Sequence, residues 1–189
     1  MISAILLAAG QSKRMINENK LIKKFNGVPL IKHSVDNILS SNVNELIIVI
    51  GYQMKIIQNI FKKNNKIKFV VNDNFADGIS TSIKIGLEHL SNKSEAFFIC
   101  LGDMPLINKK IYNHLIKSRK ENHIVVPTYK NNQANPVLFS KFMKTSVMTV
   151  TGDFGAKKIL NQNKNKILNI KIDDISITKD FNTKDDFIS

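Results

Sequence analysis

The sequence predicts an α/β fold of three layers, with a mostly parallel sheet between two layers of helices. Short apolar runs recur along the 189 residues, and each has the length and composition of a strand buried on both faces. Amphipathic helical patterns separate these runs, as in folds whose helices connect parallel strands. The sequence shows neither an internal repeat nor a linker rich in glycine, serine or proline, which predicts a single domain over residues 1–189.

The apolar runs give the expected strands. Two of them are followed by a glycine, Gly51 or Gly102. Pro105 prevents the strand before Gly102 from continuing. The expected strands cover residues 2–8, 45–50, 67–71, 96–101 and, with a weaker pattern, 123–127.

The expected helices follow from apolar residues spaced three and four apart. In the first, Leu30, Ile31, Val35 and Ile38 fall on one face, and Pro29 suits the start of a helix. The expected helices cover residues 29–41, 53–63, 79–90, 109–120 and 155–161.

The net charge of +13 and the pI of about 9.8 admit two interpretations. One is attraction to a polyanion, which makes a basic nucleic-acid-binding module an alternative function. The other is a lysine-rich surface, because the lysines are spread along the chain without a block of five or six like charges. Zinc-finger and helix-turn-helix signatures are missing and aromatic content is 7%, so we expect no nucleic-acid partner.

Cys100 is the single cysteine, which excludes an internal disulfide framework and a cysteine-based zinc site. Its place within an apolar run predicts an inert core residue. No apolar stretch approaches the roughly 18 residues of a membrane span. The N-terminal run lacks the basic flank of a signal peptide. We therefore expect a cytoplasmic protein without a membrane partner.

In open parallel sheets the ligand binds at the carboxyl ends of the strands. After the first expected strand comes LAAGQSKRMINENK (residues 7–20), a turn with one glycine followed by Lys13, Arg14 and Lys20. The turn amides and cationic side chains suit a phosphate, although a plain strand-to-loop turn is the alternative. Neither a G-x-G-x-x-G fingerprint nor a P-loop is present.

The fourth expected strand leads into GDMP, which contains Asp103. A carboxylate at this edge could hold Mg²⁺ against phosphate oxygens, or could simply be a turn residue. The third strand leads to Asn72 and then to Gly78 and the hydroxyls of residues 80–82. Those hydroxyls could cap a helix or contact a nucleotide.

Five motifs occur in family order: LAAGQSKRM…K, N-x₅-G-I-S-T-S, GDMP, ANPVLF and TGDFGAKKIL. Together they resemble the MobA-like nucleotidyltransferases, in particular the molybdenum cofactor cytidylyltransferase branch. The resemblance runs from residue 2 to about residue 186. The Ala8-Ala9-Gly10 triplet favours this branch, since guanylyltransferase relatives typically carry a second glycine there.

The resemblance implies a Rossmann-like α/β/α sandwich of the nucleotide-diphospho-sugar transferase type. It also implies Mg²⁺-dependent transfer of CMP from CTP to the phosphate of a molybdopterin-type acceptor, with release of pyrophosphate. The alternatives are GTP, another phosphorylated acceptor, or a nucleotide-binding maturation factor for a molybdenum hydroxylase. Such a hydroxylase is also a candidate partner, and we expect a monomer or weak homodimer.

Roles follow by position in the motifs. Catalysis is implied for Arg14, Lys20 and Asp103, and metal binding for Asp103 and Asn182. The acceptor side is implied for Asn135, Pro136 and Asp153. Nucleotide contacts are implied for Leu7, Ala8, Ala9, Gly10, Arg14, Lys20, Asn72, Ser80, Thr81, Ser82, Gly102 and Asp103.

The chain departs from the family pattern at four positions. Ile16 and Ala134 replace glycines, and Lys157 stands where arginine is common. Asn182 replaces a second aspartate, so a metal there would have one fewer negative ligand. Asn182 or Thr183 is also expected to cap a turn that begins with Asp185 and Asp186.

Overall fold

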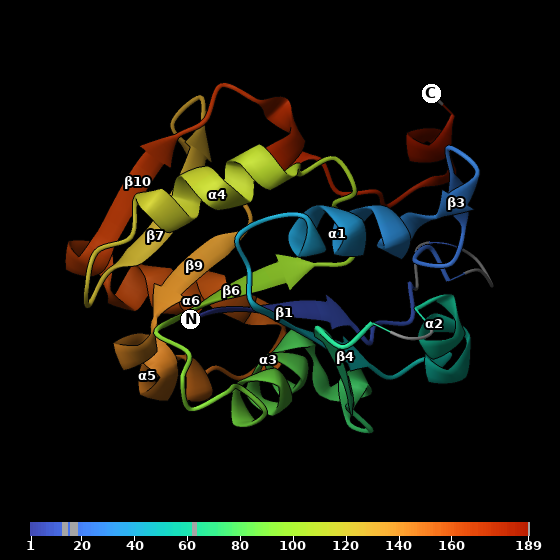
Figure 1. Cartoon of the computed structure of the whole chain (residues 1–189), viewed down its shortest axis with the longest axis horizontal. Helices are drawn as coiled ribbons and strands as arrows, with labels where there is room; N and C mark the ends of the chain where they lie inside the picture. Colours follow the sequence, from blue (N-terminus) through green and yellow to red (C-terminus); the bar gives the residue numbers. More distant parts are fainter. Residues whose placement is uncertain (13–14, 16–18, 62–63, 189) are drawn as a thin grey trace.

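The computed structural model describes residues 1–12, 15, 19–61 and 64–188. In this part of the chain a sheet of eight strands has the order β10-β7-β9-β6-β1-β4-β5, and β8 pairs with β7 (Figure 1). The strands are β1 (Ile2–Ala8), β4 (Glu45–Ile50), β5 (Ile67–Val71), β6 (Ala96–Leu101), β7 (Ile124–Tyr129), β8 (Asn132–Gln133), β9 (Val137–Ser140) and β10 (Ile167–Lys171). A separate two-stranded ribbon joins β2 (Lys24–Phe25) to β3 (Val28–Pro29).

The central strands are parallel, as predicted. β1 pairs in parallel with β4 and β6, and β4 pairs in parallel with β5. β9 runs antiparallel to both β6 and β7, so its first residue, not its last, lies at the carboxyl edge of its neighbours. This mixed sheet therefore gathers the ends of β1, β4, β5 and β6, and the start of β9, at one edge.

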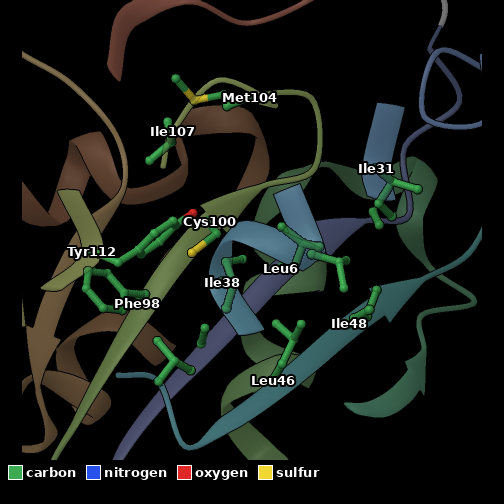
Figure 2. Packing of buried hydrophobic residues seen from close by; sticks show 14 of the residues in the cluster. Leu6, Ile31, Ile38, Leu46, Ile48, Phe98, Cys100, Met104, Ile107 and Tyr112 are labelled. Carbon is green, nitrogen blue, oxygen red and sulfur yellow. The ribbon is translucent and has the colours of Figure 1, made fainter. Parts of the chain in front are cut away.

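Two layers of helices cover the sheet (Figure 1). One layer contains α1 (Leu30–Leu39), α2 (Met54–Ile60) and α4 (Lys109–Lys117), and the other contains α3 (Ile79–Glu88), α5 (Lys144–Met148) and α6 (Gly155–Gln162). Side chains alternate along β1, so that Leu6 packs in the first layer while Ile5 packs in the second. Figure 2 shows the hydrophobic cluster of the first layer, in which Leu6 and Ile48 of the sheet lie near Ile38 of α1.

Close packing on the second face depends on Gly86 of α3. A Cβ atom at this position would lie 2.5 Å from Cγ2 of Ile5 in β1. The helix can therefore approach the sheet closely, with its N-terminus near the carboxyl ends of the strands.

The predicted elements are present: the first four strands have the predicted bounds, and four of the five helices are shorter than predicted. The first helix begins at Leu30, because Pro29 pairs with Lys24 in the β2–β3 ribbon and is the residue before the helix. The helix expected over 53–63 covers Met54–Ile60, and residues 62 and 63 lie outside the described residues. The weak strand expected at 123–127 extends to Tyr129. The sequence did not predict β9 and β10.

Two further predictions concern single features. Cys100 is 1% exposed, and burial raises the pKa of its thiol to about 12. A hydrogen bond with Tyr112 acts in the opposite direction but has the smaller effect on this pKa. It is the inert core residue that the sequence predicts. In the described part of the chain, every helix is too short or too polar to cross a membrane.

Candidate functional site

A pocket of about 410 Å³ opens at the carboxyl edge of the sheet, beyond the ends of β1 and β6. Its walls come from the turn after β1, the loop before α3, the residues after β6 and the C-terminal segment. The lining residues are Leu7, Ala8, Ala9, Gly10, Gln11, Ser12, Met15, Lys20, Leu21, Phe75, Ala76, Gly78, Ile79, Ser82, Leu101, Gly102, Asp103, Asp153 and Asn182.

One end of the pocket is charged. Lys20 donates from Nζ to Oδ2 of Asp103 at 2.5 Å and to Oδ1 of Asn182 at 2.8 Å. The Lys20 and Asp103 side chains are only 15% and 16% exposed, so this ion pair is shielded from most of the solvent. Three segments that are remote in sequence therefore meet at a single ammonium group. We name Lys20, Asp103 and Asn182 the charged end.

The C-terminal segment is anchored beside Asp103. The backbone N–H of Phe181 donates to the carbonyl of Asp103 at 2.9 Å. The Phe181 ring packs edge-on against Phe25, 4.9 Å between centroids, in a small cluster with Leu30. These contacts place Asn182 next to Lys20, and Asn182 in turn donates from Nδ2 to Asp180.

The segment ends in a capped turn over Lys184–Phe187. Thr183, rather than Asn182, is the cap, and Asp186 accepts from the backbone N–H groups of both Thr183 and Asn182 at 2.8 Å. These hydrogen bonds lower the pKa of the Asp186 carboxyl below its ordinary value, and the bond from Thr183 has the largest effect.

The turn after β1 is fixed through its backbone. Gly102 donates from its N–H to the Leu7 carbonyl at 3.1 Å, and Tyr52 donates to the Ala9 carbonyl at 3.1 Å. Ser12 has a φ of 54° and accepts at Oγ from the backbone N–H of Lys20 at 3.2 Å. The turn and Lys20 are thus held together. Lys13, Arg14 and Ile16, to which the sequence assigned phosphate binding or loop stiffness, lie outside the described residues.

On its α3 side, where Asp153 also lies, the pocket borders a cluster of neutral polar side chains. Asn72, 2% exposed, donates from Nδ2 to Thr81 Oγ1 and to Ser82 Oγ, both at 2.9 Å. Its Oδ1 accepts from the backbone N–H of Asn74 at 3.0 Å. We name Asn72, Thr81 and Ser82 the neutral end. Of the three, Ser82 lines the pocket, while Asn72 and Thr81 lie behind it.

The suggestion that the hydroxyls of residues 80–82 cap α3 is wrong. These residues lie inside the helix, Gly78 precedes it, and Thr81 Oγ1 donates to the carbonyls of Gly78 and Asn74. The helix start is instead capped from a distant segment, since Asp153 Oδ1 accepts from the Ile79 N–H at 3.2 Å. Asp153 thereby enters the pocket wall.

Gly78 allows that contact. Its φ is +106°, and a Cβ there would lie 2.7 Å from Asp153 Oδ1 and 2.8 Å from the Gly152 carbonyl carbon. Both its conformation and its surroundings therefore require glycine.

The remaining sequence-predicted residues lie apart from the pocket wall. Ser80 is buried in α3 and does not line the pocket. Asn135 and Pro136 lie just before β9, at the same edge of the sheet, and the Asn135 N–H donates to the Ile177 carbonyl at 3.2 Å. Their assignment to an acceptor stays a prediction.

Sequence analysis missed several lining residues, including Gln11, Phe75 and Ala76. Phe75 lies in a short helical turn before Gly78, and its Cδ1 is 2.6 Å from where a Gly51 Cβ would be. The signal in the sequence that could have indicated this lining residue was the position of Phe75 within the motif from Asn72 to Ser82. Alone, it does not distinguish a pocket wall from the core.

A divalent metal fits the charged end. Asp103 Oδ1 is buried and has no hydrogen-bond partner among the described residues. The Asn182 amide oxygen lies close by, because it accepts a hydrogen bond from the same Lys20 that pairs with Asp103. The described residues contain no cluster of three or more His, Cys, Asp or Glu that could form a protein cage for a metal. This donor set suits Mg²⁺, which commonly takes one or two protein oxygens and completes its shell with substrate phosphates and water.

Comparison with known proteins gives a family match. The description "MobA-like NTP transferase domain" matches residues 4–167. The chain is 31% identical over 136 residues to the probable molybdenum cofactor guanylyltransferase of Thermococcus sibiricus, covering 70% of this chain and 65% of that protein. It is 24% identical over 188 residues to the molybdenum cofactor cytidylyltransferase of Escherichia coli K12, covering 100% and 94%.

The coverage of other relatives is smaller. The chain is 23% identical over 142 residues to the bifunctional protein GlmU of Staphylococcus epidermidis, covering 75% of this chain and 31% of that protein. The chain thus spans 65% of the Thermococcus protein and about a third of GlmU.

Solved structures show the same fold. Rv0371c from Mycobacterium tuberculosis H37Rv superposes with a TM-score of 0.88 at 20% identity, covering 99% of this chain and 95% of that one. Its manganese complex gives 0.81 at 18% identity, covering 99% and 96%. The 4-diphosphocytidyl-2C-methyl-D-erythritol synthase of Anaerococcus prevotii gives 0.80 at 18% identity, covering 100% and 93%. The fold is the nucleotide-diphospho-sugar transferase type that the sequence resemblance implied.

Proposed function

The chain belongs to the family of MobA-like NTP transferase domains, and from this premise we propose that it transfers CMP from CTP to the phosphate of a molybdopterin-type acceptor. The observation that carries the proposal is the charged end of the pocket. A buried carboxylate with an unpartnered oxygen, a shielded ammonium and an amide oxygen converge beside a turn of small residues. Phosphoryl and nucleotidyl transfer commonly uses such cationic groups together with a carboxylate that holds a metal.

The reaction needs no protein nucleophile. An oxygen of the acceptor phosphate monoester, ionised near neutral pH, attacks the α-phosphorus of the nucleotide. The bond from that phosphorus to the oxygen bridging to the β-phosphorus breaks, and its electron pair leaves with pyrophosphate. A phosphoanhydride forms between the acceptor and CMP, so the products account for every atom.

The residues supply position and charge. Lys20 brings an ammonium to the phosphates, and the backbone of Ala8, Ala9 and Gly10 forms the wall along which the nucleotide lies. Asp103 and Asn182 would hold Mg²⁺, which neutralises phosphate charge when bound. Arg14, by its position in the motif, adds a second cation. Asn135, Pro136 and Asp153 are proposed for the acceptor side.

A second candidate nucleotide is GTP. It is favoured by the 31% identity to a probable molybdenum cofactor guanylyltransferase. CTP is favoured by the Ala8-Ala9-Gly10 triplet and by similarity along the full chain to a cytidylyltransferase. A nucleotide panel separates the two.

The test is pyrophosphate release from each of the four NTPs, with Mg²⁺ and molybdopterin as the acceptor. We expect release with CTP and little with the others. Release with GTP alone would transfer the proposal to the guanylyl reaction. No release with any NTP, from protein that binds nucleotide, would overturn the enzymatic function and favour a nucleotide-binding maturation factor.

A further inference from the structure

We propose that Asn72 is a positioning residue that fixes the Ser82 hydroxyl as a hydrogen-bond donor toward the nucleotide. Because the ligand is taken to be a nucleotide, this inference rests on the proposed function. The sequence resemblance implied direct nucleotide contact for Asn72, but Asn72 is 2% exposed and does not line the pocket. Its effect on a ligand must therefore pass through another side chain.

The orientation of the Asn72 amide is determined by its neighbours. The backbone N–H of Asn74 can only donate, so the amide atom that faces it must be the oxygen. The amide nitrogen then faces the hydroxyls of Thr81 and Ser82 and gives one hydrogen to each. Flipping the amide would place its NH₂ group against the Asn74 N–H, with no acceptor between them.

The two hydroxyls differ in how they use their own hydrogens. Thr81 Oγ1 donates to the carbonyls of Gly78 and Asn74, so its hydrogen is committed to the backbone. Ser82 Oγ accepts from Asn72, and among the described residues it has no acceptor for its own hydrogen. Ser82 is 5% exposed and lines the pocket. We name the hydrogen bond from Asn72 to Ser82 the relay. It leaves one buried O–H donor, that of Ser82, facing the ligand.

A donor at this position selects for an acceptor atom on the ligand. A carbonyl oxygen or an unprotonated ring nitrogen of the base satisfies Ser82, whereas an N–H group at the same point would leave two donors facing each other. A buried donor without a partner carries a desolvation penalty, which makes the preference strong. The neutral end thus favours a ligand that presents a hydrogen-bond acceptor to Ser82. Asn72 sets this preference because it fixes Ser82 as a donor.

The decisive variant is Asn72→Asp, which is nearly isosteric. One carboxylate oxygen can still accept from Asn74, but the other cannot donate and instead accepts the Ser82 hydrogen. Ser82 then presents lone pairs to the ligand. We expect the Kd for CTP with Mg²⁺, measured by calorimetry, to rise about tenfold or more. KM should rise with it while kcat changes less.

The epistasis test uses Ser82→Ala. This variant alone should also weaken CTP binding about tenfold. Adding Asn72→Asp to it should cause little further loss, because the hydroxyl through which Asn72 acts is already missing. Asn163→Asp is the matched control: Asn163 donates from Nδ2 to the Ile159 carbonyl, away from the pocket, and its variant should leave the Kd unchanged.

The outcomes separate the two proposals. Additive losses from Asn72→Asp and Ser82→Ala would overturn the role of Asn72. Normal CTP binding by Ser82→Ala would overturn it as well, and that result does not depend on Asn72→Asp folding. Wild-type protein that binds nucleotide but releases no pyrophosphate would overturn the transferase function and leave the relay intact. Wild-type protein that binds no nucleotide would overturn both.

Discussion

The charged and neutral ends of the pocket are assembled in different ways. The charged end joins residues 83 and 162 positions apart through Lys20. The neutral end forms within a short stretch, since Asn72 bonds to residues only 2, 9 and 10 positions away. The first depends on the whole fold, and the second on one strand, one loop and one helix start.

This difference separates two tasks. The charged end offers full charges and an unpartnered carboxylate oxygen, which suit a metal and phosphates. The neutral end offers a hydrogen-bond pattern fixed before a ligand arrives. Substitutions at the charged end should therefore affect turnover and metal binding, while those at the neutral end should affect nucleotide affinity.

The largest effect is expected from Asp103→Asn. The amide keeps the shape but removes the charge that pairs with Lys20 and would hold the metal. We expect kcat to fall by about 10²–10³, the usual scale for losing one electrostatic group in a transfer site. Binding of Mn²⁺, followed by electron paramagnetic resonance, should weaken in parallel. Asp173→Asn, at an exposed pair with Lys171, is the control and should change neither quantity.

Lys20→Met is expected to separate metal binding from turnover. Without the ammonium, the oxygens of Asp103 and Asn182 lose their cation, so Mn²⁺ should bind more tightly in the absence of nucleotide. Turnover should nevertheless fall about a hundredfold, because the phosphates lose the same charge. Weaker Mn²⁺ binding would contradict the competition between ammonium and metal. Lys32→Met, from an exposed helix pair, is the control.

Gly78→Ala should disturb the neutral end and leave metal binding alone. The alanine must adopt a φ of +106° and push its Cβ against Gly152 and Asp153. We expect a loss of about 1–3 kcal/mol in the free energy of unfolding, measured with urea, and weaker CTP binding. Gly10→Ala is the stability control, since a Cβ there would meet nothing within 4 Å. Unchanged stability in Gly78→Ala would show that the helix start adjusts freely.

The smallest effect is expected from Asp186→Asn, which loosens the anchor of Asn182. The folded pKa of Asp186 lies below its ordinary value, so the carboxylate stabilises the folded state above an ordinary pKa of about 3.9. That contribution is lost as the pH falls through the lowered folded pKa. The variant should therefore show a lower urea midpoint than wild type at pH 7, and the gap should narrow as the pH falls below about 4. Asp185→Asn is the neighbouring control, and a gap independent of pH would contradict the assignment.

The sequence predicted the fold well because its main signals are local. Buried parallel strands appear as continuous apolar runs, and the helices between them follow from three- and four-residue spacing. The antiparallel direction of β9 is not encoded in this way, since VLFS is an equally apolar run in either direction. β10 was missed because it is an edge strand whose Asn169 and Lys171 are exposed.

The site was predictable only in part. Motif positions brought Lys20, Asp103, Ser82 and Asn182 into consideration, and all four line one pocket. Sequence could not show that Lys20 bridges Asp103 and Asn182, because that contact requires the C-terminal segment to return past Phe25. Nor could it show that Asp153 caps α3, since the donor and acceptor come from segments 74 positions apart.

The reversed direction of β9 has a consequence for how such a protein can diversify. The pocket wall is built from residues before position 104, together with Asp153 and Asn182. β9 enters between β6 and β7 from the loop that carries Asn135 and Pro136, so a later segment of the chain starts at the same edge and runs in the opposite direction. Changes in that loop can alter what is presented beside the pocket without touching the turn after β1. Under the proposed function, a scaffold of this kind can exchange the acceptor over evolutionary time while keeping the nucleotide.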